Sequence, residues 1–275
     1  MRLRPGRIAL YALAIVLVLW SVFPLYYAVV TSFATDTQMF VPNYWPRAFD
    51  FSNYGEVFGR GNMASALLNS VVVAGATVLV ALVMSVFAAF AFSRVRFRGR
   101  RLLLVIVLST TMFPQVAILA GLYELMTRLG LYNSIWAVMF SYLILVLPFS
   151  VWILTAFMRG LPSEIEDVAI IDGASPRVIV IRIFLPLLWP GIIATGLVAV
   201  TAAWNEFLFA FTLTVTPDHR TVPVAIQLIW GYTPHDTPWG TIMAACVVGS
   251  APMIALALFF QRRMVSGLTA GAVSG

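Results

Sequence analysis

The sequence predicts an all-α integral membrane protein with six transmembrane helices, on three observations. Hydrophobic residues make up 61% of the 275 residues and charged residues only 10%, whereas about a quarter of a typical soluble domain is charged. Six stretches hold the roughly 20 mostly apolar residues that a spanning helix needs. The basic residues are all arginine, and they gather in alternate connections between these stretches.

The predicted spans form one transmembrane domain over residues 1–275, with a core bundle at about 64–265. They lie, within a few residues at each end, at Ile8–Val30, Ser70–Phe92, Leu102–Tyr123, Ile135–Phe157, Leu188–Phe211 and Thr241–Phe260. Cytoplasmic connections carry the excess of positive charge. With both termini in the cytoplasm, only Arg47, Arg60, Arg128 and Arg220 of the 17 basic residues lie outside. The first apolar run exceeds the core of a signal peptide and predicts an uncleaved helix.

Composition also excludes several kinds of chemistry. Without lysine there is no Walker A phosphate site and no Schiff base. The single cysteine, Cys246, lies in an apolar run, and His219 and His235 share one polar connection, so neither a disulfide nor a zinc cluster is expected. No soluble face is available to carry a basic patch for nucleic acid.

Within the connection 158–187, the stretch EDVAIIDGASPRVIVIRIFLP interrupts the apolar pattern with charge, glycine and proline. Ser163 and Glu166 have the spacing of a capping box, which predicts the start of a short helix. Gly173 predicts its end, because glycine readily takes the left-handed conformation of a C-cap. The Ser-Pro pair at 175–176 then predicts a second helix.

The first of these helices is a candidate docking element on the cytoplasmic face. Apolar residues are expected on one side of it, at Ile165, Val168 and Ala169, with acidic residues elsewhere around it. Small residues at Ala169, Gly173 and Ala174 would let another surface approach the backbone closely. A solvated connector that rests on the bilayer is an equally good interpretation of the pattern.

The same stretch resembles the signature loop of ATP-binding-cassette importer permeases, with the pattern Glu-Ala-Ala, three residues, Gly, nine residues, Ile, one residue, Leu-Pro. Here the matching positions are Asp167, Val168, Ala169, Gly173, Ile183, Leu185 and Pro186. Asp167 and Val168 depart from the family's Glu and Ala. Glu166 could stand in for the longer acid.

Further motifs resemble one branch of that family, the six-span subunit of maltose-type importers. They are AWNEF in the fifth span, LLNSVVVA at the start of the second, TVPVAIQL in the last outer connection, and the tail FQRRMVSGLTAGAVSG at 260–275. The resemblance implies a type I importer permease fold with N and C termini cytoplasmic, in a bacterial inner membrane. It further implies a second permease, two cytoplasmic ATPases and an external solute-binding protein as partners, with ATP and Mg bound by the ATPases and no cofactor on this chain.

The resemblance also implies two contacts with the ATPases. Coupling residues of the signature loop are expected at Glu164, Glu166, Asp167, Val168, Ala169, Asp172, Gly173 and Ala174. The tail, 261–275, is expected to reach between the ATPases through Gly267, Leu268, Thr269, Gly271 and Gly275.

Six residues inside the predicted spans are candidates for the translocation path: Met112, Phe113, Pro114, Trp204, Asn205 and Glu206. A carboxylate within a span is costly to bury, so Glu206 is expected to face a polar partner or a water-filled path, in a structural or gating role. Trp204 and Asn205 could stack on and hydrogen-bond a sugar, and Trp204 could equally anchor at the interface. Pro114 and Pro148 permit kinks.

The predicted function is a permease subunit for a di- or oligosaccharide, working by alternating access and not itself an enzyme. A polyol or glycerol phosphate is the alternative substrate within the family. An intramembrane serine protease would need a histidine at membrane depth, and none is expected there. A secondary carrier would show inverted repeats and charges near the midplane, neither of which is visible.

Overall fold

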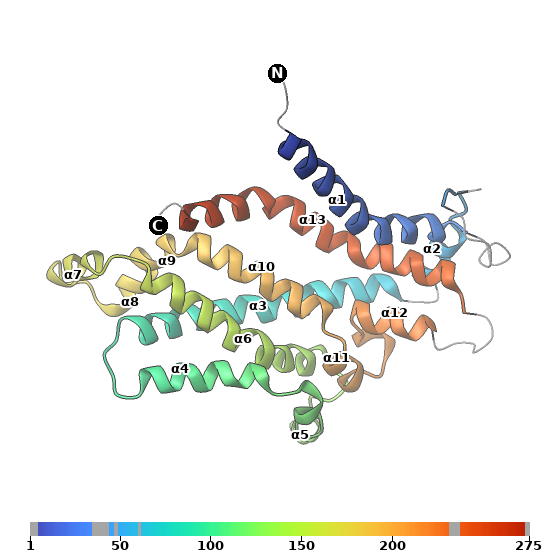
Figure 1. Cartoon of the computed structure of the whole chain (residues 1–275). Coiled ribbons are helices and arrows are strands. Elements are labelled where there is room, and N and C mark those ends of the chain that lie inside the picture. Colours follow the sequence, from blue (N-terminus) through green and yellow to red (C-terminus); the bar gives the residue numbers. More distant parts are fainter. Residues whose placement is uncertain (1–4, 35–43, 47–48, 60–61, 231–236, 273–275) are drawn as a thin grey trace. The chain divides into compact units, whose positions relative to one another are not determined.

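The computed structural model describes residues 5–34, 44–46, 49–59, 62–230 and 237–272, and all regular structure within them is helical (Figure 1). The contacts divide the chain into two compact units, which are described separately. Unit 1 is Met1–Ala64 with Ala225–Pro252, and unit 2 is Ser65–Val224 with Met253–Gly275.

Four of the described helices are long and apolar enough to cross a membrane, and up to six spans result if each of two bent helix pairs counts as one. The four are α1 (Pro5–Ser32), α3 (Met63–Ser93), α6 (Ile135–Arg159) and α13 (Trp239–Ala272). Pro148 lies inside α6 without ending it. The six predicted spans fall on these four helices and on parts of the two bent pairs, which gives between four and six spans.

The third predicted span is not one straight helix. Its first half, α4 (Arg100–Ser109) with the 3₁₀ turn η2 (Thr110–Met112), meets α5 (Gln115–Arg128) at 94°. Phe113 is extended (φ −71°, ψ 133°), because the ring of a following proline disfavours the helical conformation. Pro114 is extended as well. The predicted kink is thus a full break, with two consecutive residues outside the helix.

The fifth predicted span is broken at both ends. A helical run through α8 (Pro176–Val178), the π-helical segment η3 (Ile179–Phe184) and α9 (Leu185–Leu187) meets α10 (Trp189–Asn205) at 77°. At the other end the extended Glu206 separates α10 from α11 (Leu208–Leu213). The sequence analysis placed Glu206 inside the fifth spanning helix. In the structure it lies at a break between two helices.

One end of unit 2 is held together by polar contacts to backbone. Asn69 donates from Nδ2 to the carbonyl oxygens of Asp218 and Arg220, at 2.7 and 3.0 Å. The hydroxyl of Ser70 accepts from the amide of Val222, at 2.8 Å. These bonds join the start of α3 to η4 (Pro217–His219) and to the first turn of α12 (Val222–Trp230). The motifs LLNSVVVA and TVPVAIQL, separate in sequence, meet here.

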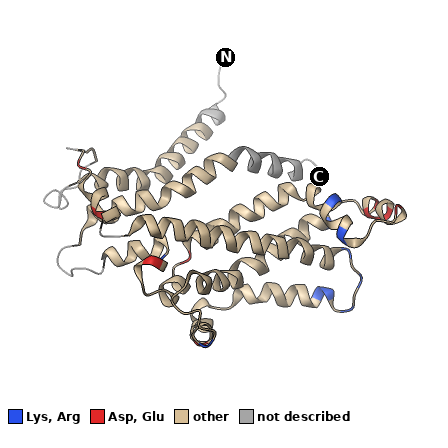
Figure 2. Ribbon diagram, turned by 180° about the vertical axis from the view of Figure 1, so that it is seen from behind, with Lys and Arg blue, Asp and Glu red and all other residues tan. Residues whose placement is uncertain are grey.

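The middles of α3, α6 and α10 carry no charged residue (Figure 2). This arrangement is what a bilayer requires of spanning helices. The opposite end of unit 2 from Asn69 holds the connection between α3 and α4 and the connection that follows α6, which touch each other through Arg94.

In unit 1, α2 (Ser52–Gly59) is fixed by a buried amide. Asn53 donates from Nδ2 to the carbonyls of Ser32 and Ala34 at 2.9 and 3.0 Å, and its Oδ1 accepts from the Thr241 hydroxyl at 3.3 Å. The amide thereby joins the end of α1 to the start of α13.

Candidate functional site

The connection that follows α6 begins with a short helix, α7 (Glu164–Ile171). The capping box predicted at its start is wrong. Ser163 is itself helical (φ −71°, ψ −27°) and its hydroxyl makes no capping bond, because an N-cap side chain reaches the first-turn amides from an extended backbone. Its carbonyl instead accepts from the amides of Glu166 and Asp167, at 2.9 and 3.2 Å.

The end of α7 is confirmed at Gly173, which has φ +78°. The amide of Gly173 donates to Ile170 O at 3.0 Å, and that of Ala174 donates to Ala169 O at 2.9 Å. These two bonds are the Schellman pattern, which needs a residue in the left-handed conformation. A Cβ on Gly173 would meet no atom within 4 Å, so the backbone angle alone favours glycine here. Ser175 is extended and Pro176 begins the next helix, but the serine side chain makes no cap bond.

The sides of α7 differ from the prediction. Ala169 is buried in the chain's own core, together with Ile179 and Phe184 of η3, and Ala174 packs against the same cluster. These small residues therefore bring α7 close to its own chain. Val168 and Ile171 are 59% and 84% exposed. The outer surface of α7 is thus an apolar tip, bordered by three exposed acidic residues: Glu164, Asp167 and Asp172.

Arg94, directly after α3, fastens this connection to the rest of unit 2. Its Nη2 donates to the carbonyls of Met158 and Leu161, at 2.9 and 2.6 Å. Its Nε lies 3.7 Å from Glu166 Oε2, and its guanidinium carbon lies 5.0 Å from the centre of the Phe184 ring. A cation at this position satisfies carbonyls at the C-terminal end of α6, which lack partners within the helix.

Two points about this cluster differ from the sequence analysis. Arg94 was not among the predicted coupling residues, since it looks like the first of five arginines between 94 and 101 that mark a cytoplasmic connection. Glu166 points to Arg94 and its side chain is only 18% exposed. It is therefore not placed as a free substitute for the family's outward-facing acid.

The second predicted helix of the connection is confirmed as the run from α8 to α9. Its inner side is buried in one apolar cluster with α3, α6, α7 and α10: Val86, Ala89, Leu154, Met158, Ala169, Ile179, Val180, Phe184, Leu188 and Ile192. The short α7 is therefore continuous with the core that carries α10.

Glu206 is 6% exposed, and its partners are in the protein. Its carboxylate oxygens accept from the amides of Phe209 and Ala210, at 2.9 and 3.3 Å, and so cap α11. The Tyr142 hydroxyl of α6 donates to the Glu206 carbonyl at 3.0 Å. Glu206 thus has polar partners within the chain, one of the two surroundings expected for it.

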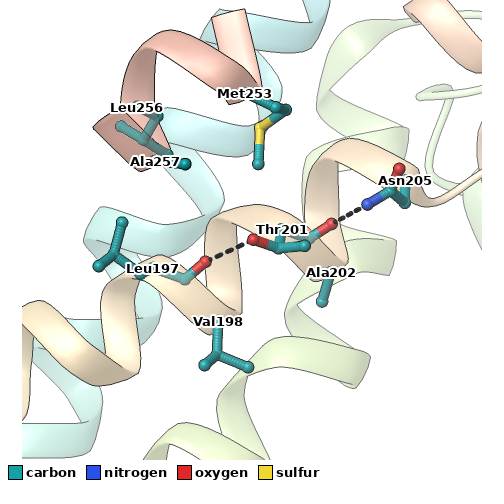
Figure 3. A pocket seen from close by; sticks show the side chains of 8 residues that line it. All are labelled: Leu197, Val198, Thr201, Ala202, Asn205, Met253, Leu256 and Ala257. Atoms are coloured by element: carbon teal, nitrogen blue, oxygen red, sulfur yellow. Dashed lines mark hydrogen bonds between the residues drawn. The ribbon is translucent and has the colours of Figure 1, made fainter. Parts of the chain in front are cut away.

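Trp204 is 7% exposed, so its ring is available neither to a sugar nor to the membrane interface. The two interpretations of Trp204, as a sugar-stacking residue and as an interfacial anchor, are therefore wrong for the chain in this structure. Asn205 is exposed and borders a cavity of about 460 Å³ between α10 and the later part of α13 (Figure 3). Its Nδ2 donates one hydrogen to Thr201 O at 2.9 Å, so Oδ1 and the second Nδ2 hydrogen are the polar groups that Asn205 can offer. The other lining residues are Leu197, Val198, Ala202, Met253, Leu256 and Ala257.

The remaining candidates do not converge on this cavity. Met112 and Phe113 are 83% and 64% exposed at the break before Pro114. The tail positions Gly267, Leu268, Thr269 and Gly271 lie on the last turns of α13, where side chains are outside the described residues, as is Gly275. His219 lies in η4, whereas His235 is outside the described residues. Among the described residues, no group of three or more metal-binding side chains is found.

Residues 81–269 match the protein family described as "Binding-protein-dependent transport system inner membrane component". The chain is 37% identical to the trehalose/maltose transport system permease protein MalG of Thermococcus litoralis, over 98% of this chain and 97% of that protein. It is 35% identical to the sulfoquinovosyl glycerol transport system permease protein SmoH of Agrobacterium fabrum, over 98% and 95%. It is 36% identical to the trehalose transport system permease protein SugB of Mycobacterium tuberculosis, over 84% of each.

The fold is similar to a chain in the crystal structure of a bacterial ABC transporter involved in the import of the acidic polysaccharide alginate. The TM-score is 0.80 at 21% identity, and the match covers 95% of this chain and 98% of that chain.

Proposed function

Because the chain belongs to the family of binding-protein-dependent transport system inner membrane components, we propose that it is the permease subunit of an ATP-driven importer for a di- or oligosaccharide. It works with a second, related permease, two cytoplasmic ATPases and an external solute-binding protein. The ATPases bind ATP and Mg, and this chain has no lysine with which to build a Walker A site.

One observation carries the proposal: α7 presents an apolar tip with an acidic border outward while its other side is fixed to the chain's own core. Val168 and Ile171 are exposed, whereas Ala169 is buried and Glu166 is paired with Arg94. A helix that is anchored on one side and free on the other can transmit a push from a partner into the bundle. The exposed coupling residues are then Glu164, Asp167, Val168 and Asp172, with Ala169, Gly173 and Ala174 setting the position of α7.

The route of coupling follows the chain. When the ATPases close, α7 moves with the surface that it contacts. The helical run from Pro176 to Leu187 shares the buried cluster with α7 and leads into α10. Movement of this run rotates α10, on which Thr201 and Asn205 border the cavity of about 460 Å³. Glu206 caps α11 on the far side of the break, so the break is a hinge between α10 and α11.

A neutral sugar is the proposed substrate, because relatives named for trehalose and maltose align over nearly the whole chain. No arginine lies in the middle of α3, α6 or α10 to neutralise a phosphate or sulfonate. The relative named for sulfoquinovosyl glycerol makes a glycerol glycoside the second candidate.

The proposed orientation has both chain termini in the cytoplasm. The two arginine-bearing connections that sequence assigns inside touch each other, through the bonds from Arg94 to Met158 and Leu161. The connections assigned outside likewise touch each other, since Asn133 Oδ1 accepts from the amides of Val215 and Thr216, at 2.8 and 3.0 Å. The alternation of inner and outer connections is thus consistent with the contacts in unit 2.

The test compares two glycines of the same geometry at opposite ends of unit 2. Gly173 and Gly130 have φ +78° and +69°, and each ends a helix in the Schellman pattern. Proline at either position is incompatible with a positive φ and removes the amide hydrogen bond. In proteoliposomes with the second permease, the binding protein and the ATPases, we expect Gly173→Pro to abolish sugar uptake and sugar-stimulated ATP hydrolysis. For Gly130→Pro, we expect the wild-type ratio of sugar transported to ATP hydrolysed, per assembled complex. Uptake by Gly173→Pro at the wild-type rate would contradict the proposal.

A further inference from the structure

A cavity of about 350 Å³ lies between α3, α4 and α6 in unit 2, apart from the one that Asn205 borders. Its wall on α3 is a stripe of residues four apart, Met84, Ala88 and Phe92, which extends about 12 Å along the helix. The only hydroxyl in the wall, that of Thr110, donates to Val107 O at 2.7 Å. The cavity is therefore an apolar slot parallel to the helix axes. The remaining lining residues are Leu147, Pro148 and Val151.

The slot is shaped for entry from the side. Val151, on α6, is only 4% exposed, whereas Met84 on the rim is 48% exposed. A cavity of this size lies in the range of sites for small apolar ligands, about 300–1,000 Å³. Its occupant must be long, apolar and present within the membrane.

Near the last turn of α3, the slot adjoins a group of arginines without acidic partners among the described residues. The ring of Phe92 lies 6.2 Å from that of Phe97, centre to centre, and Phe97 stands between Arg96 and Arg98. Arg101 follows at the start of α4, whose first turn carries no acidic residue. Within the described residues, the ion pairs are Arg94–Glu166 and Arg128–Glu124, and neither involves these three arginines.

We propose that this juxtaposition is a binding site for an anionic phospholipid, with one acyl chain in the slot between α3, α4 and α6 and the phosphate of the headgroup at Arg96, Arg98 and Arg101. Several arginines next to a spanning helix attract anionic headgroups at about a factor of five each. Charge complementarity thus selects the headgroup, and the slot selects an acyl chain over a soluble phosphate. Gly99, with φ +85°, lies at the turn between Arg98 and the start of α4.

The site is tested directly on the purified wild-type chain, with the subunits that co-purify with it. The complex is placed in vesicles that contain either phosphatidylglycerol or phosphatidylcholine with a photoreactive group in the acyl chain. We expect the phosphatidylglycerol probe to label peptides that contain Met84–Phe92 and Val107–Thr110, at least about tenfold more than the phosphatidylcholine probe.

Variants then separate the headgroup from the acyl chain. Arg96→Gln with Arg98→Gln is expected to reduce slot labelling roughly 25-fold. The matched control is Arg177→Gln with Arg182→Gln, which also removes two exposed arginines, on a segment that does not line the slot. Ala88→Phe, which fills the slot, is expected to abolish labelling there.

Each other outcome overturns the proposal. Equal labelling by both probes would mean that the arginines do not recognise the headgroup. Labelling of the wild type outside the slot would place the lipid elsewhere, and absence of slot labelling would mean that another subunit covers it.

Discussion

Replacement of Arg94 by alanine tests whether this residue holds α7 in place. The substitution removes two hydrogen bonds to the carbonyls of Met158 and Leu161, at 2.9 and 2.6 Å, and the partner of Glu166 at 3.7 Å. The Arg94 side chain is only 10% exposed, so solvent reaches these contacts poorly. Loss of the guanidinium should therefore loosen the α6–α7 connection.

The magnitude follows from the kind of bond. Each hydrogen bond from a charged donor contributes about 1.5–3 kcal/mol, and the ion pair with Glu166 adds about 1 kcal/mol or less. Carbonyls near the protein surface regain part of this from water, so a net loss of about 3 kcal/mol is expected. This corresponds to opening of α7 roughly two orders of magnitude more often.

Hydrogen exchange at the amides of Gly173 and Ala174 measures that opening, because their bonds close the end of α7. Arg94→Lys keeps the charge but cannot reproduce the planar fork of donors, so an intermediate effect is expected. Arg128→Ala, at the end of α5 with a side chain that is 76% exposed, is the control for lost charge.

Coupling is measured in the same samples as sugar transported per ATP hydrolysed, which should fall in Arg94→Ala and remain unchanged in Arg128→Ala. Unchanged exchange at Gly173 and Ala174 in Arg94→Ala would refute the argument that the arginine fixes α7. Faster exchange with unchanged coupling would refute the argument that fixing α7 matters for transport.

Three further substitutions test the fold around the site by thermal unfolding of the purified complex. Glu206→Ala leaves two buried amides without acceptors and is expected to cost about 2–4 kcal/mol, whereas Glu206→Gln retains an acceptor and should cost about half as much. Gly191→Ala would place a Cβ 2.7 Å from the Phe157 ring and should destabilise α10, with recovery when Phe157→Leu is added. Asn133→Ala removes the acceptor of two backbone amides and leaves alanine at a positive φ, and is expected to cost about 1–3 kcal/mol of stability. Asn133→Gly relieves the backbone strain but does not restore the hydrogen bonds, so it should recover only part of that loss.

Local signals in the sequence predicted much of α7 and its surroundings. Gly173 ended the helix because glycine readily takes a positive φ, and Pro176 began the next one because its ring fixes φ near the helical value. The capping box predicted at Ser163 is wrong because the backbone of Ser163 is already helical. That conformation depends on the direction in which the chain leaves α6, which the residues around Ser163 do not determine.

The long-range features were out of reach of any local pattern. Arg94 contacts residues 64 to 90 positions away, and it is one of five arginines between 94 and 101. The break at Glu206 is hidden because, apart from Asn205, the residues around it are apolar on both sides. The sequence did offer one sign of the break, because a carboxylate can accept hydrogen bonds from nearby backbone amides and so interrupt a helix. The sequence analysis considered only the cost of burying that carboxylate.

The signature positions at which this chain departs from its family are exposed, whereas the buried position of the triplet is unchanged. Of the triplet Asp167, Val168 and Ala169, only Ala169 is buried in the chain's own core, at 6% exposure, and it keeps the family's small side chain. Val168 is 59% exposed and does not belong to the buried cluster. Asp167 is also exposed. The position that packing constrains is thus unchanged, and both altered positions lie on the surface that we assign to the ATPase. Compensation for them is therefore to be sought in the partner's groove and not within this chain.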